Sequence, residues 1–211
     1  MKLKIPGYAK IPFLGMLIIN GLVFLGTRII TDNMYHYDLS CKLDEMIPFA
    51  SVFVIPYVCA YLQWIIGFVM IANVGKEHCL YIFGGEIIAK LIIGVIYIAF
   101  PTTIMRPMIE ANDIFSNMVA LIYRVDPPTS LFPSIHCLES WICLRGCIRQ
   151  DFFGKKYKFI MALMTISVFL STVLIKQHVI SDVISAVIVG ELGLFLARIV
   201  RRRMQSKNNT H

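Results

Sequence analysis

Apolar residues in this sequence gather into long runs, and the lengths of these runs restrict the folds open to the chain. A helix needs about 20 mostly apolar residues to cross the hydrocarbon core of a bilayer. Hydrophobic residues make up 57% of the 211 residues and charged residues only 16%, whereas soluble domains have about 45–50% and about 25%. The sequence therefore predicts an all-α polytopic membrane protein, a bundle of six transmembrane helices. The predicted spans lie near residues 11–30, 48–74, 80–100, 134–147, 159–175 and 179–200.

The predicted spans follow one another without a dividing segment. The sequence contains no internal repeat, low-complexity tract or Pro/Gly/Ser-rich linker, so we expect residues 1–211 to form a single domain. The first apolar run is long and is followed by further spans, which favours a membrane helix over a signal peptide. The six cysteines lie mostly within apolar runs and lack paired zinc-type spacing. We therefore expect no disulfide framework, no metal site and no cofactor.

The chain has a net charge of +7, and its positive residues gather in segments that are expected on one side of the membrane. The N-terminal lysines, among them Lys2, together with Lys76, residues 145–158 and the tail from Arg198 hold most of the 20 Lys and Arg residues. By the positive-inside rule these segments are cytoplasmic, most simply at the plasma membrane, and both termini lie on that side. The basic tail at 201–203 then suits anionic lipid and predicts no nucleic-acid partner.

A histidine and an aspartate stand together at the start of the last span. His178 and Asp182 are four residues apart, which places them on one face of a helix. A carboxylate inside a membrane helix costs roughly 2.5–3.5 kcal/mol on insertion scales, so it requires a polar partner. Asp182 can accept the Nδ1 proton of His178 and leave Nε2 free as a nucleophile or base.

Two other segments are expected at the same extracytoplasmic level as His178. Residues 100–107 bring Arg106, whose planar guanidinium suits phosphate oxygens. Residues 132–136 bring Ser134 at a helix start and His136 on the first turn. Two histidines, an aspartate, an arginine, a serine and Lys176 are typical of a phosphoryl-transfer site that uses no metal.

These segments resemble the three signature motifs of the type 2 phosphatidic acid phosphatase superfamily. The family pattern is roughly KxxxxxxRP, PSxH and SRxxxxxHxxxD. This chain has AFPTTIMRP at 99–107, PSIH at 133–136 and STVLIKQHVISD at 171–182, in the same order and with the same internal spacing. The residues FPTT…RP, together with KQH, are also similar to those of the branch that contains sphingomyelin and inositol phosphorylceramide synthases.

The resemblance implies a role for each matching residue. His178 would attack phosphorus to form a phosphohistidine, and Asp182 would orient it. His136 would protonate the leaving alkoxide and then activate water or an alcohol. Arg106 and Ser134 would bind the phosphoryl oxygens.

Two positions depart from the family pattern. Ala99 stands where the first motif usually has lysine, and Thr172 stands where the third usually has arginine. Lys176, in the turn before His178, is the predicted substitute for the arginine. Lys90 is better explained as an i,i+4 partner of Glu86. One turn after His136, Glu139 either orients the His136 ring or contacts another helix.

The sequence leaves three functions open. The first is a metal-independent lipid phosphatase acting on a lipid phosphate or diphosphate, such as phosphatidate or a polyprenyl diphosphate. The second is a lipid phosphotransferase, which uses the same residues and passes the phosphoryl group to a lipid alcohol. The third is a non-catalytic transporter that binds phospholipid headgroups. The oligomeric state is equally open.

Overall fold

Helices form almost all the regular structure in the computed structural model, which describes residues 4–110 and 112–208. Lys2, used above to orient the chain, lies outside the described residues. Within them, five helices are long and apolar enough to cross a membrane, which confirms the all-α class and supports a polytopic membrane protein. These helices are Gly7–Thr31, Ser51–Ala72, Lys76–Ala99, Lys155–Leu174 and Ile180–Ser206.

The first of these helices is composite. It begins as α1 (Gly7–Gly21), continues through the π-helical turn η1 (Leu22–Gly26) and ends as α2 (Thr27–Thr31). The others contain α4 (Val54–Ala72), which follows the 3₁₀ turn η2 (Ser51–Phe53), then α5 (Lys76–Ala99), α8 (Lys155–Leu174) and α9 (Ile180–Asn208). Each of these five helices coincides with a predicted span to within a few residues, apart from the longer C-terminal end of α9.

The remaining predicted span, 134–147, corresponds to the shorter helix α7 (Ile135–Ile148). Its 14 residues extend about 21 Å, less than the roughly 30 Å of hydrocarbon. Most of its side chains are buried, and it packs against α4, α8 and α9. Surrounded in this way, α7 is a central helix of the bundle, and it is less apolar because it contacts protein and not lipid.

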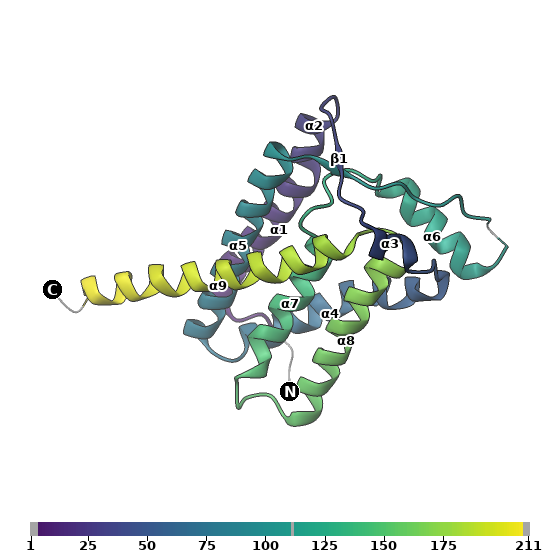
Figure 1. The fold of residues 1–211 in the computed structure, drawn as a ribbon. Helices are drawn as coiled ribbons and strands as arrows, with labels where there is room; N and C mark the ends of the chain where they lie inside the picture. Colours follow the sequence, from purple (N-terminus) through teal and green to yellow (C-terminus); the bar gives the residue numbers. More distant parts are fainter. Residues whose placement is uncertain (1–3, 111, 209–211) are drawn as a thin grey trace.

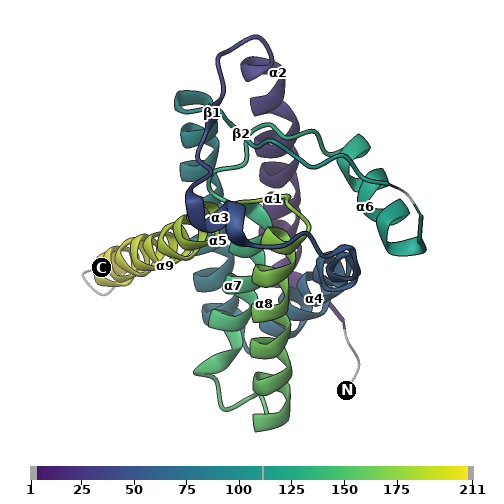
Figure 2. The ribbon, with the colours of Figure 1, turned by 45° about the vertical axis from the view of Figure 1, so that its right-hand side comes forward.

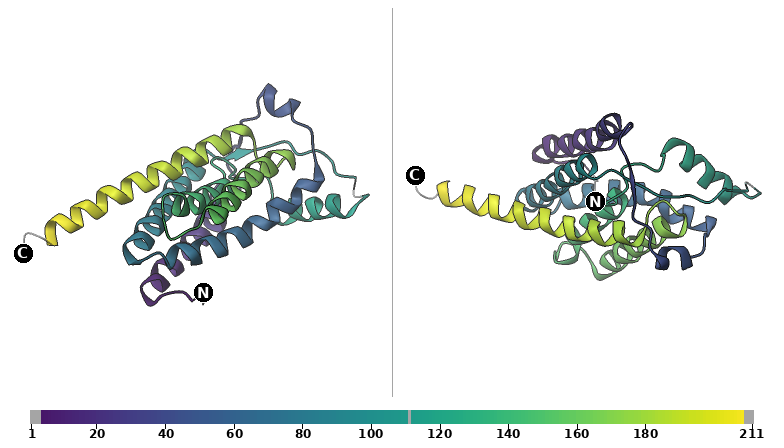
Figure 3. Two further views of the ribbon diagram at one scale, coloured as in Figure 1. Left: turned by 90° about the horizontal axis from the view of Figure 1, so that it is seen from below. Right: turned by 45° about the horizontal axis from the view of Figure 1, so that its top comes forward.

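With α7 counted, successive helices of the bundle run in opposite directions, so their connections gather at two ends (Figure 1). One end holds the 73–75 and 149–154 turns and both termini. The other holds the two long connections, 32–50 and 100–134 (Figure 2). These carry α3 (Lys42–Met46), α6 (Ile114–Val125) and two short strands, β1 (Tyr37–Asp38) and β2 (Thr102–Thr103), which pair in parallel. Figure 3 shows α6 beside one end of the bundle, where its residue Val119 shares a small buried cluster with Val54 and Tyr57 of α4.

The closest helix contact joins α5 to α9. A Cβ atom added to Gly193 would lie 2.3 Å from the carbonyl oxygen of Gly85, and one added to Gly85 would lie 2.7 Å from a methyl of Leu194. Small residues allow membrane helices to approach at backbone distance. This contact fixes the position of α9, whose first turn carries Asp182 and which directly follows the turn that carries His178.

Candidate active site

The predicted histidine–aspartate pair is formed at the start of α9. His178 Nδ1 lies 3.0 Å from Asp182 Oδ2, and both side chains are buried. Because a carboxylate only accepts, Nδ1 carries a proton, and in the neutral ring Nε2 has the free lone pair. The same carboxylate oxygen accepts from the Val179 amide at 3.2 Å. The ring of His178 is thus held in one orientation.

The turn before His178 is held by the backbone of Thr172. The Thr172 carbonyl accepts from the amides of Gln177, at 2.9 Å, and His178, at 3.0 Å. Lys176 in this turn has a φ of 54°, in the left-handed region. The Thr172 side chain is fully buried and donates to the Phe169 carbonyl at 2.9 Å. At the position where the family has arginine, this chain therefore has a structural threonine.

The PSIH segment is attached directly to this turn. The Ser134 amide donates to the Asp182 carbonyl at 3.1 Å, which joins the start of α7 to the start of α9. The Ser134 hydroxyl accepts from the Cys137 amide at 3.3 Å, so it caps α7 as expected of a serine at a helix start. Its side chain is buried. A contact between Ser134 and phosphate stays a prediction.

His136 lies among aromatic rings. Its ring stacks on Tyr57, with centroids 4.3 Å apart, and meets Tyr61 and Trp64 edge-on at 5.6 and 5.1 Å. The centroid of His178 is 6.4 Å away. His136 Nε2 is buried without a hydrogen-bond partner among the described residues. The two histidines are therefore neighbours, as the resemblance implied.

Arg106 is anchored from one side only. Its Nη1 donates to the carbonyl of Asp126 at 2.8 Å, and its guanidinium lies over the Tyr123 ring, 4.4 Å from the centroid. Burial lowers the pKa of the Arg106 guanidinium, against the charge of Asp126. Its Nε and Nη2 atoms are buried and have no partner within the described chain. These donors are available to an anion.

The Lys176 side chain already has hydrogen-bond partners within the protein. Its ammonium donates to the carbonyls of Asp44 and Ile47, both at 2.7 Å. Two of its three donors therefore tie the α3 segment to the turn that carries His178. The predicted role of Lys176 in binding phosphate is left with one donor.

A cavity of about 450 Å³ joins several of these residues. Arg106, Lys176 and His178 line it, together with side chains of the 38–49 segment. The described lining does not include His136. The predicted nucleophile and two predicted phosphate ligands thus face one space.

Two carboxylates that the sequence did not single out support this arrangement. Asp44 Oδ1 accepts from the Ile180 amide, at the start of α9, at 2.8 Å. Burial raises the pKa of Asp44, but hydrogen bonds from Cys41 and Ile180 outweigh it and hold that pKa below 3.8. Asp126 accepts from Gln177 at 3.0 Å, and burial raises its pKa against the positive charge of Arg106.

Hydrogen bonds also join the first two motifs. The Thr102 hydroxyl accepts from the amides of Leu131 and Phe132, each at 3.0 Å. The Tyr97 hydroxyl donates to the Pro133 carbonyl at 2.7 Å. Ala99, by contrast, is exposed. The three motifs form one connected structure although their outer ends, Ala99 and Asp182, are 83 residues apart.

Lys90 and Glu139 lie deeper, away from the cavity. Lys90 forms ion pairs with both Glu86 and Glu139, and all three side chains are buried. The predicted Glu86–Lys90 pair is confirmed. Of the two roles considered for Glu139, the structure shows the contact with another helix.

Comparisons of the chain with protein-family models, with curated proteins and with solved structures find no match. The family resemblance therefore rests on the three motifs, and the activity it implies stays a prediction.

Proposed function

We propose that the protein is an integral membrane lipid phosphatase, a six-helix bundle with its catalytic cavity at the extracytoplasmic face. In this arrangement α7 is the sixth, central helix. The observation that carries the proposal is the His178–Asp182 pair at a cavity that Arg106 and Lys176 also line. A positioned nucleophile with its orienting carboxylate, beside unpartnered cationic donors, is the arrangement that phosphoryl transfer requires.

The proposed reaction has two steps. In the first, His178 Nε2 attacks the phosphorus of a lipid phosphate, an N–P bond forms, and the P–O bond to the lipid breaks. Protonated His136 gives its proton to the leaving alkoxide, which departs as a lipid alcohol. In the second, neutral His136 takes a proton from water, whose oxygen attacks phosphorus and releases inorganic phosphate from His178.

The spacing of the two histidines supports these roles. Reacting atoms approach to about 3–3.5 Å, and a general acid reaches its oxygen across about 2.6–3.2 Å. The ring centroids of His136 and His178 are 6.4 Å apart, so both rings lie within reach of one phosphoryl group. The charge that develops on the phosphoryl oxygens would be met by Nε and Nη2 of Arg106.

The test is a panel of lipid phosphates and diphosphates offered to purified protein in nanodiscs, with release of inorganic phosphate as the readout. We expect activity in wild type, its loss in His178→Ala, and an acid-labile phosphoenzyme trapped only when His178 is present. Chelation with EDTA should leave the rate unchanged. Full inhibition by EDTA that added metal reverses, or an equally active His178→Ala variant, would refute the proposal.

One observation favours the transferase alternative. Lys176 gives two of its donors to backbone carbonyls, so fewer free cations face the cavity than in a site built for a phosphate dianion. A phosphodiester carries one charge less and suits such a site better. Adding diacylglycerol or ceramide to the same assay distinguishes the two reactions, because transfer yields a new phospholipid in place of free phosphate.

A further inference from the structure

A second cavity, of about 210 Å³, lies between α1 and α4. Its walls are apolar and aromatic side chains, with two charged groups and one amide at their inner side. The lining residues are Phe13, Met16, Leu17 and Asn20 of α1, Tyr61, Trp64, Ile65 and Phe68 of α4, Lys90 of α5 and Glu139 of α7. It is separate from the catalytic cavity, with which it shares no lining residue.

The charged groups of this cavity belong to the buried ion cluster. Lys90 is 1% exposed and lies between Glu86, at 0%, and Glu139, at 5%. Two carboxylates share one ammonium here, so both the carboxylates and the ammonium can form further hydrogen bonds. Glu139 Oε2 and Asn20 Oδ1 are buried acceptors without a hydrogen-bond partner among the described residues, and Lys90 retains a third donor. Unpaired buried polar atoms at a cavity call for a ligand or water.

The chemistry of these atoms selects the ligand. An anionic headgroup would meet two carboxylates, and a cationic headgroup would meet the Lys90 ammonium across apolar walls. A hydroxyl oxygen satisfies both sides, because it can accept from Lys90 and donate to Glu139 at the same time. The cavity is too small for a whole lipid, but its rim residues Leu17 and Ile65 are 58% and 59% exposed on the outer surface of the bundle. A lipid chain can continue there.

We infer that this cavity binds the hydroxyl end of a neutral lipid alcohol, with the lipid chains lying along α1 and α4. Two of its walls, Tyr61 and Trp64, also contact the His136 ring. A lipid alcohol is the organic product of the proposed phosphatase and the acceptor of the alternative transferase. The binding itself is argued from the cavity alone, and its meaning as a product or acceptor site rests on the proposed function.

The test uses a photoactivatable diacylglycerol in nanodiscs, with labelled peptides identified by mass spectrometry. We expect saturable labelling of α1 and α4 peptides. Unlabelled diacylglycerol should compete, whereas its acetyl ester, which lacks the hydroxyl, should compete at least about tenfold more weakly. Ceramide as a second competitor tells whether the site accepts a different lipid backbone.

Matched variants localise the site. Leu17→Trp should reduce labelling several-fold by filling the rim, whereas Leu14→Trp, on the same helix at 57% exposure and outside the lining, should not. Glu139→Leu keeps the Glu86–Lys90 pair and should weaken competition by the alcohol toward that of the ester. Equal competition by alcohol and ester, or equal labelling of the two tryptophan variants, would overturn the inference.

His178→Ala separates this inference from the proposed function. The variant should lose phosphate release and keep hydroxyl-dependent labelling. Hydroxyl-dependent labelling of a wild-type protein that releases no phosphate would refute the phosphatase and leave the binding site standing. Phosphate release without saturable labelling would refute the binding site and leave the phosphatase standing.

Discussion

The contact between His178 and Asp182 gives the sharpest prediction for a single residue. Asp182→Asn keeps one acceptor oxygen for the Val179 amide but removes the charge that stabilises a protonated or phosphorylated His178 ring. We expect the rate of phosphate release to fall by about 10²–10⁴-fold, as in other histidines that lose their orienting carboxylate. Thermal unfolding in detergent should change little. A variant that retains more than a tenth of the rate would show that Asp182 only caps the turn.

Lys176 has two competing roles, and one substitution separates them. If it mainly ties the α3 segment to the catalytic turn, Lys176→Met should release the 41–47 segment at a cost of about 1.5–3 kcal/mol and increase the rate at which a maleimide reacts with the exposed Cys41. If it mainly binds phosphate, KM should rise while the reactivity of Cys41 stays constant. The contacts with the Asp44 and Ile47 carbonyls lead us to expect the first result.

Contacts between single residues differ in whether the sequence could predict them. The His178–Asp182 contact could be predicted from the spacing of four residues, although His178 lies in the turn before α9 and not on the helix itself. The support from Asp44 could not, because 136 residues separate it from its partner Ile180 and packing alone decides which loop covers the site. Arg106 is anchored on the carbonyl of Asp126. Every residue has a carbonyl, so the sequence carries no signal for that contact.

At the scale of elements, the α5–α9 contact controls the site from a distance. Gly193→Ala places a methyl group against the Gly85 carbonyl and must push the helices apart, which we expect to cost about 1–3 kcal/mol. The neighbouring Gly84→Ala has open space and should be neutral or stabilise by about 0.5–1 kcal/mol. Thermal unfolding of both variants, with phosphate release, gives the comparison. Equal stability would mean that the contact is loose enough to accept a side chain.

Element boundaries followed from the apolar runs wherever a helix has the length and composition of a membrane span. The predicted span 134–147 has the same length as α7, Ile135–Ile148, but the apolar pattern did not show that α7 is a central helix buried against α4, α8 and α9. The start of α6 carries a signal of its own in the sequence, since Asp113 caps the helix through the Phe115 and Ser116 amides. The cavity between α1 and α4 had no sequence signal, since it arises from side chains of four different helices.

At the scale of the whole molecule, the two ends of the bundle differ in chemistry. The end with the cavity lined by Arg106, Lys176 and His178 carries the long connections, and the opposite end carries most of the lysines and arginines. Only the second end suits the cytoplasmic side of a membrane by the positive-inside rule. In the proposed function, a lipid phosphate would then reach the cavity from the outer leaflet.

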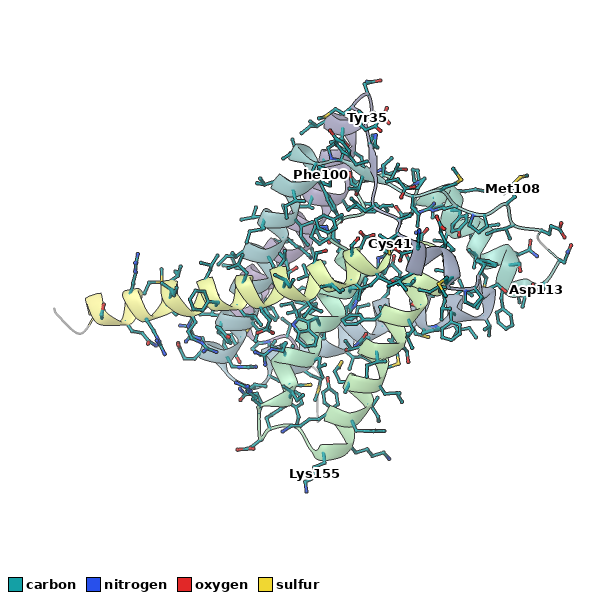
Figure 4. The ribbon with its side chains drawn as sticks, in the orientation of Figure 1. Tyr35, Cys41, Phe100, Met108, Asp113 and Lys155 are labelled. Carbon is teal, nitrogen blue, oxygen red and sulfur yellow. The ribbon has the colours of Figure 1, made fainter. Side chains whose placement is uncertain are left out.

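The native Cys41 and one engineered cysteine test this orientation. Cys41 is exposed on the segment that covers the cavity, and Lys155 is exposed at the opposite end (Figure 4). We expect a membrane-impermeable maleimide to label Cys41 in intact cells and to leave Cys41→Ser unlabelled. Lys155→Cys, placed in the Cys41→Ser background, should react only after the membrane is opened. The reverse pattern would put the cavity on the cytoplasmic face, where the lipid phosphates of the inner leaflet would be the substrates to test.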